Sequence, residues 1–153
     1  MTSKPVVYTA QSKQFFYCRD AVCEFVFRAE AMPLNPFRVF DYFLGDRVDR
    51  DAIRAANAEM LSRCDEVWVF GEALADGVLL EIAQAASEGK PVRYFSIENS
   101  ADAIRELTLE RLSFEDEVHE DTGLDKIQLL DRLRNGRTSD LALALGRPLR
   151  VTA

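Results

Sequence analysis

Histidine is almost absent from this chain, since His119 is the only one among 153 residues. The three cysteines, Cys18, Cys23 and Cys64, are an odd number, and no two of them form a Cys-x-x-Cys pair. A histidine-dependent catalytic triad and a multi-histidine metal centre are therefore excluded, and the cysteines are expected to be buried, reduced thiols. We expect neither a metal nor a cofactor.

Long hydrophobic runs are also missing. No apolar stretch approaches the ~18 residues of a membrane span, and the amino terminus lacks the apolar region of a signal peptide. Acidic residues outnumber basic ones, 26 against 19, which gives a net charge of −7. That balance argues against binding to nucleic acid polymers or to anionic membranes. The sequence therefore predicts a cytoplasmic protein that acts on a small molecule.

The first hundred residues alternate between strand and helix patterns. Apolar, β-rich runs at residues 6–10, 67–70 and 92–97 predict strands. The proline-bearing segment 32–37 predicts a further short strand or an extended loop. Apolar residues spaced three and four apart predict helices at 14–32, 49–63 and 78–87, with a short helical turn at 39–44. This order predicts a single α/β domain with a doubly wound parallel sheet, Rossmann- or flavodoxin-like, spanning residues 1–97.

Residues 98–153 have a different composition. Helical patterns at 101–109, 124–134 and 141–145 surround an acidic run at 112–121. We interpret this part as an all-helical extension. It either packs on the α/β core or forms the face of a homodimer, and the sequence leaves both arrangements open.

The stretch from Cys64 to Ile97 carries the strongest functional signal. A buried strand leads into a loop with Asp76 and Gly77, and Glu81 follows in the first turn of the expected helix. Open α/β sheets bind ligands at the carboxyl ends of their strands, and the positive end of a helix favours an ionised carboxylate there. If the first and third strands are parallel neighbours, Tyr8 reaches the same edge and can donate a hydrogen bond to Glu81.

Further candidates lie on the approach to Glu81. Asp76 supplies a second carboxylate, Gly77 allows close backbone approach to a ligand, and Gln11 and Ser12 lie where a strand-to-helix turn meets a phosphate. Two carboxylates and a tyrosine suit attack at the anomeric carbon of a sugar. Each residue also fits a structural role, as a helix first-turn glutamate, a core tyrosine, an ordinary turn or a solvated cap.

Several segments together resemble one family. They are Val7-Tyr8-Thr9-Ala10, Pro33-Leu34-Asn35-Pro36, the Cys64-to-Phe70 phrase, Gly77 to Glu81 with Ala85, and Gly89-Lys90-Pro91-Val92. This combination resembles the nucleoside 2-deoxyribosyltransferase-like superfamily, which includes the transferases, the deoxynucleoside 5′-monophosphate N-glycosidases and uncharacterised bacterial and phage relatives. The resemblance covers roughly Val6 to Ile97.

The resemblance implies that Glu81 is the nucleophile and Tyr8 its orienting partner, in a homodimer. It adds Asn35 and Asp65 to the substrate-binding candidates. Two features depart from the family pattern. The acidic residue that the transferases carry two positions before the motif glycine is replaced by Ala75, with the acid displaced to Asp76. The first loop also lacks the Gly/Ser-rich composition of the nucleotide hydrolases.

The leading functional hypothesis is therefore an N-glycosidase or 2-deoxyribosyltransferase acting on a nucleoside or a nucleoside 5′-monophosphate. One alternative is a non-catalytic nucleotide-binding or sensor domain on the same fold, because a fold does not determine a function. Another is a phosphoribohydrolase acting on riboside monophosphates, although the chain has no Pro-Gly-Gly-x-Gly-Thr motif.

Overall fold

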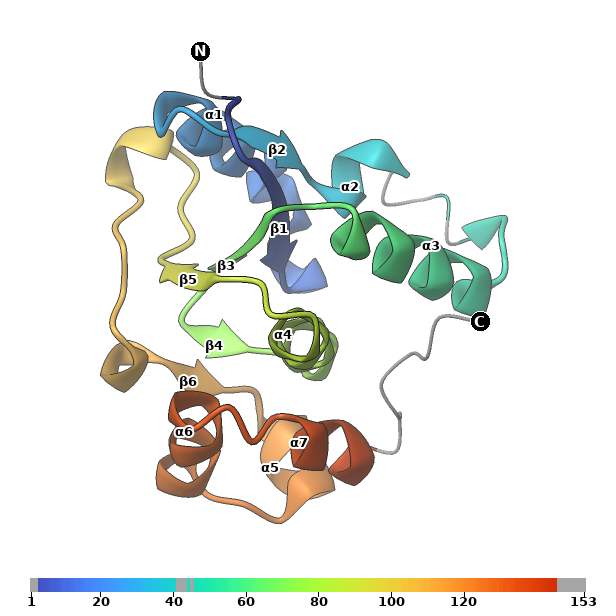
Figure 1. Cartoon of the computed structure of the whole chain (residues 1–153), viewed down its shortest axis with the longest axis vertical. Helices are drawn as coiled ribbons and strands as arrows, with labels where there is room; N and C mark the ends of the chain where they lie inside the picture. Colours follow the sequence, from blue (N-terminus) through green and yellow to red (C-terminus); the bar gives the residue numbers. More distant parts are fainter. Residues whose placement is uncertain (1–2, 41–43, 45, 146–153) are drawn as a thin grey trace.

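A parallel sheet of four strands forms the centre of the computed structural model, which describes residues 3–40, 44 and 46–145 (Figure 1). The strand order is β2-β1-β3-β5, and every neighbouring pair is parallel. The bounds are β1 Val6–Gln11, β2 Met32–Leu34, β3 Glu66–Phe70 and β5 Val92–Phe95. The predicted α/β fold with a Rossmann-like parallel sheet is confirmed.

Helices cover both faces of this sheet. Val22 and Val26 of α1 (Arg19–Arg28) pack with Trp68 and Phe70 on one face. On the other face, α3 (Arg50–Ser62) and α4 (Asp76–Ser87) pack against the alternate strand residues, such as Tyr8. The chain leaves β1 toward β2 and later returns to β3 on the other side, so the winding direction changes between β1 and β3.

The helix predicted at 14–32 is interrupted. Residues Lys13–Cys18 form a 3₁₀ helix, η1, and α1 follows, ending before Glu30, which has a positive φ of 61°. A four-residue helix, α2 (Pro36–Val39), follows β2. It covers only the start of the short turn predicted at 39–44, of which residues 41–43 lie outside the described part of the chain.

Two polar side chains form hydrogen bonds that hold the amino ends of the strands together. Asp65 Oδ2 accepts a hydrogen bond of 2.8 Å from the Val6 amide. Lys90 Nζ donates to the carbonyls of Cys64, at 2.6 Å, and Ser62, at 3.1 Å. These bonds hold the start of β3 against β1 and against the turn that leads into β5. The segments Cys64-Asp65 and Gly89-Lys90-Pro91 therefore have a structural role here.

The carboxyl-terminal part is not all helical. Ser113–Phe114 (β6), inside the acidic run 112–121, pairs in parallel with Ala73–Leu74 (β4). The remaining elements are the 3₁₀ turns η3 (Ala101–Ala103) and η4 (Leu109–Arg111), and helices α5 (Asp116–Thr122), α6 (Lys126–Arg134) and α7 (Ser139–Ala144).

The helix predicted at 101–109 is wrong for an identifiable reason. The chain there runs along the edge of β5, where the Leu107 amide donates to the Tyr94 carbonyl at 2.7 Å. The Ser96 amide donates to the Arg105 carbonyl at 2.8 Å, and Glu106 pairs with Arg93. Pairing with an exposed strand edge replaces the helical hydrogen bonds that the local sequence favours.

This carboxyl-terminal part packs on the α/β core. Leu112, Phe114, Val118, Leu129 and Leu141 are buried in the same hydrophobic cluster as the apolar side of α4. Helix α7 lies against α4, as Figure 1 shows. In the part of the chain that the structure describes, no helix is long and apolar enough to cross a membrane.

We expect Lys90→Met to lower the free energy of unfolding by about 1.5–3 kcal/mol, because two carbonyls lose a charged donor. Urea denaturation measures this change. Lys126→Met, at an exposed position, is the control and should change stability by less than about 0.5 kcal/mol. Equal effects of the two substitutions would show that the Lys90 contacts do not stabilise the fold.

Candidate active site

Tyr8 and Glu81 meet between the sheet and α4. The Tyr8 hydroxyl donates a short hydrogen bond to Glu81 Oε2, across 73 residues of sequence. Tyr8 is placed by β1, where it lies opposite Val67 of β3 and Leu34 of β2. Glu81 is placed by α4, which packs on the same face. The structure thus brings together the two residues expected to form the catalytic pair.

The environment of this pair controls its protonation. Tyr8 is fully buried, and Glu81 is half-buried. Burial raises the pKa of Glu81 to about 7, and the hydrogen bond from Tyr8 acts in the opposite direction. Burial, and then the charge of Glu81, raise the pKa of Tyr8 well above its usual value. Tyr8 therefore remains a neutral donor, while Glu81 titrates near neutral pH.

Two expectations about this pair are corrected. Helix α4 begins at Asp76 rather than Val78, which puts Glu81 in the second turn, where the helix dipole has less effect. Burial dominates instead, so the pKa of Glu81 is raised rather than lowered. Tyr8 is the third residue of β1, and the strand continues to Gln11. The pair consequently lies over the face of the sheet rather than at the ends of the strands.

Gln11 lies at the carboxyl end of β1, as expected, and Asn35 follows the carboxyl end of β2. Asn35 Nδ2 donates to Gln11 Oε1 at 2.8 Å, and Gln11 Nε2 donates to the Phe15 carbonyl at 2.7 Å. Asn35 Oδ1 also accepts from the Phe37 amide at the start of α2. Both side chains are at least 95% buried. The side-chain amides of both residues therefore have hydrogen-bond partners within the protein.

Ser12 contacts a residue that the sequence analysis missed. Its hydroxyl donates to Glu115 Oε2 at 3.1 Å, across 103 residues, and accepts from the Gln14 amide at 3.4 Å. Glu115 precedes the first residue of α5 and is half-buried. The sequence signal for it was the acidic run 112–121, which by itself resembles a solvated surface.

Asp76 and Gly77 form the first turn of α4. Asp76 Oδ1 accepts from the Gly77 amide at 2.7 Å. A Cβ at Gly77 would meet no atom of the described residues within 4 Å, so the backbone at this turn borders open space. The φ of Gly77 is not among the positive ones, so its role is not a left-handed turn.

Asp65 lies away from these residues. It precedes β3 at the amino ends of the strands, where its carboxylate binds the Val6 amide. Tyr8 lies on the sheet face covered by α4, the helix that carries Glu81. Gln11, Ser12 and Asn35 lie at the carboxyl ends of the strands, whereas Asp65 lies at the amino ends. The geometry therefore gives Asp65 a structural contact and separates it from the other predicted site residues.

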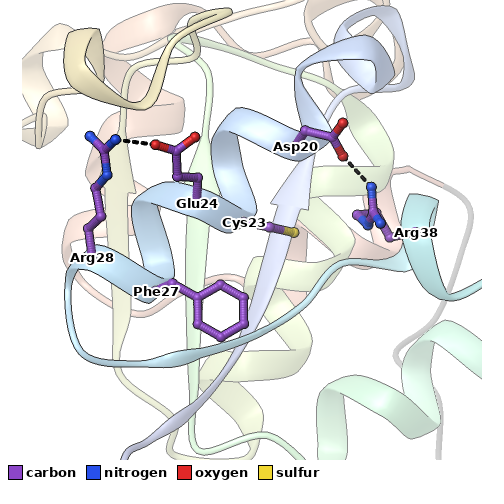
Figure 2. Close-up of a pocket in the computed structure, with 6 residues that line it drawn as sticks. All are labelled: Asp20, Cys23, Glu24, Phe27, Arg28 and Arg38. Atoms are coloured by element: carbon purple, nitrogen blue, oxygen red, sulfur yellow. Dashed lines mark hydrogen bonds and ion pairs between the residues drawn. The ribbon is translucent and has the colours of Figure 1, made fainter.

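A surface hollow of about 610 Å³ lies over α1 rather than over Glu81, and Figure 2 shows its lining. Its charged side chains neutralise one another, since Arg28 pairs with Glu24 and Arg38 pairs with Asp20. Apart from those four, Cys23 and Phe27 line it. Among the described residues, no group of three or more His, Cys, Asp or Glu side chains is arranged to hold a metal ion.

The raised pKa of Glu81 predicts a pH-dependent effect of Glu81→Gln on stability. Between pH 4.5 and about 7 the folded protein binds a proton that the unfolded chain releases, so wild-type stability falls as pH rises through this window. A neutral glutamine lacks this loss. The stability of Glu81→Gln relative to wild type should therefore increase by about 1–3 kcal/mol from pH 4.5 to 8.

Urea denaturation of both proteins at several pH values measures this difference. Glu98→Gln, at an exposed glutamate, controls for the loss of one charge. A difference between Glu81→Gln and wild type that stays constant from pH 4.5 to 8 would contradict a raised pKa at Glu81.

Comparison with known proteins places this site within a family. Residues 8–95 match the family described as Domain of unknown function (DUF7768). No curated protein matches the chain. The matched span runs from Tyr8 to Phe95 and includes Glu81, whereas Glu115 lies beyond it. Because the match covers more than half of its length, the chain belongs to the DUF7768 family, a domain of unknown function.

Proposed function

We propose that this protein is an N-glycosidase or 2-deoxyribosyltransferase, in which Glu81 attacks the anomeric carbon of a nucleoside or nucleotide. The observation that carries the proposal is the hydrogen bond from the buried Tyr8 to the half-buried Glu81. A carboxylate oriented by a fixed donor, yet partly accessible, has the properties of a nucleophile. The resemblance to the nucleoside 2-deoxyribosyltransferase-like superfamily assigns the same roles to the same two residues.

In the first step, an oxygen of ionised Glu81 forms a bond to C1′ as the bond between C1′ and the base nitrogen breaks. The bonding electron pair leaves with the base, which takes up a proton from water. The developing oxocarbenium charge is stabilised by the carboxylate itself. Tyr8 holds the Glu81 rotamer, and its neutral hydroxyl stabilises the charged carboxylate before attack.

In the second step, water or the nitrogen of another base attacks C1′. The ester bond to Glu81 breaks, its electron pair returns to the carboxylate, and the nucleophile loses its proton to solvent or to Asp76. Hydrolysis and base exchange therefore share the same protein groups. They differ only in which nucleophile reaches the glycosyl-enzyme intermediate.

The partner of Arg93 distinguishes this proposal from a purely structural role for Glu81. A binding module on this fold would be expected to neutralise Glu81 with a cation such as Arg93. Arg93 instead forms two hydrogen bonds with Glu106, at 2.8 and 2.9 Å, and its guanidinium lies 4.7 Å from the centre of the Trp68 ring. Glu81 accepts a hydrogen bond from the neutral Tyr8 hydroxyl. Its carboxylate is therefore oriented without being neutralised by Arg93, and it is able to react.

A second candidate function is a nucleotide sensor without catalysis. It is favoured by the contact between α7 and α4, the helix that carries Glu81, because a ligand at α4 would affect the carboxyl-terminal helices directly.

In either case we place the protein in the cytoplasm as a homodimer. Cys18, Cys23 and Cys64 are unpaired, and burial raises the pKa of Cys64 to about 11, as suits unreactive thiols in a reducing compartment.

Base release from a panel of ribo- and deoxynucleosides and their 5′-monophosphates tests the catalytic proposal. We expect wild type to release base from at least one substrate, and Glu81→Gln to lower kcat at least about a thousandfold because the nucleophile is lost. Glu98→Gln is the matched control and should retain full activity. Binding of one compound without release would favour the sensor, and release that persists in Glu81→Gln would exclude Glu81 as the nucleophile.

The pH dependence of activity tests the role of Tyr8. Attack requires ionised Glu81, so kcat/KM should rise with pH through a midpoint of about 7. Tyr8→Phe removes the hydrogen bond that lowers this pKa, and should move the midpoint to higher pH. It should also lower kcat about tenfold to a hundredfold through loss of orientation. An unchanged midpoint in Tyr8→Phe would show that the hydroxyl does not act on Glu81.

A further inference from the structure

The turn after β1 contains a contact that the catalytic steps do not use. Ser12 follows Gln11, the last residue of β1, and is 5% exposed. Its hydroxyl donates to Glu115 Oε2 at 3.1 Å. In doubly wound sheets, the turn at the carboxyl end of a central strand is where a phosphate group binds. In this chain, the serine at that turn already donates its hydrogen bond to a carboxylate of the protein, that of Glu115.

The amino terminus of α4 provides the second place where a phosphate would be expected. The amides of a first helical turn attract anions, and α4 has twelve residues. Here Asp76 Oδ1 accepts from the Gly77 amide at 2.7 Å. A second carboxylate of the protein therefore lies at the anion-binding end of the helix that carries Glu81.

These two carboxylates act on a common region. The pKa of Glu117 is raised first by the charge of Asp76, then by desolvation and by the charges of Glu115 and Asp121, while Lys13 acts in the opposite direction. Glu117 thus lies within electrostatic range of both the β1 turn and the start of α4. The charge balance of this edge is negative, with Lys13 as the opposing cation.

We propose that the substrate is a nucleoside without a 5′-phosphate, and that Glu115 excludes the monophosphate from the carboxyl end of β1. The inference rests on the proposed N-glycosidic chemistry at Glu81. A phosphate monoester carries about −1.5 to −2 charges at pH 7 and would be repelled by Glu115 and Asp76. A 5′-hydroxyl carries no charge and is not repelled in this way.

The experiment compares a deoxynucleoside with its own 5′-monophosphate, for wild type, Glu115→Gln and Glu120→Gln. Wild type should have a kcat/KM at least about tenfold higher for the nucleoside. Glu115→Gln keeps an oxygen that accepts from Ser12 but removes the charge. It should raise kcat/KM for the monophosphate about tenfold, because the repulsion between unit charges ~6 Å apart at intermediate dielectric corresponds to about a factor of ten. It should change kcat/KM for the uncharged nucleoside less than about twofold.

Glu120→Gln removes one exposed charge from α5, the helix that follows Glu115, and should behave as wild type. Increasing salt with the wild-type protein provides a test that needs no variant. Screening should raise kcat/KM for the monophosphate relative to the nucleoside.

The outcomes separate this inference from the proposed function. A wild-type preference for the monophosphate, or a relative loss of monophosphate activity with added salt, would overturn the role of Glu115 and leave catalysis by Glu81 standing. Release of base from neither compound, nor from any other in the panel, would overturn the proposed function and this inference with it.

Discussion

The parallel pairing of β1 with β3 is the constraint on which the site depends. It places Tyr8 opposite Val67, with its side chain on the face covered by α3 and α4. It also puts the change of winding direction beside Gln11 and Ser12, where the two strands end. Asp65 and Lys90 hold this register from the amino ends of the strands. A one-residue slip would turn Tyr8 toward α1 and away from Glu81.

Carboxylates act in two different ways along α4. Glu81, in the second turn, is half-buried beside a neutral tyrosine, and desolvation brings its pKa to about 7. Asp76, in the first turn, lies in a region that Glu115 and Glu117 also make negative. Environment thus distinguishes Glu81, whose raised pKa allows it to gain or lose a proton near neutral pH, from the acidic residues gathered around the start of α4. The proposed chemistry needs the first, and the proposed substrate preference follows from the second.

The sequence predicted those parts of the site that depend on periodicity and on strand order. Tyr8 and Glu81 could be paired from the sequence because an apolar strand, a helix and a second apolar strand imply parallel neighbours with α4 packed across them. The start of α4 was misplaced by two residues, since Asp76 and Gly77 resemble a turn as much as a helix start. That error also reversed the expected pKa shift of Glu81, because the dipole of a first turn was assumed in place of burial.

Other features depended on contacts between distant residues and left little local signal. Ser12 and Glu115 are 103 residues apart, and the acidic run around Glu115 has the composition of a solvated loop although β6 lies within it. Residues 101–109 favour a helix locally, yet pairing with the edge of β5 keeps Glu106 extended beside Phe95. Asp65 fitted a family motif, and only the structure shows that its carboxylate contacts the Val6 amide at the amino ends of the strands.

Trapping of the covalent intermediate would test the central claim most directly. The protein would be incubated with a deoxynucleoside from which it releases base, quenched in acid, and examined by intact-mass and peptide mass spectrometry. The account predicts a mass increase equal to one deoxyribosyl group, located on Glu81 and absent from Glu81→Gln. Release of base with the sugar on another residue, or an adduct of equal yield in Glu81→Gln, would contradict it.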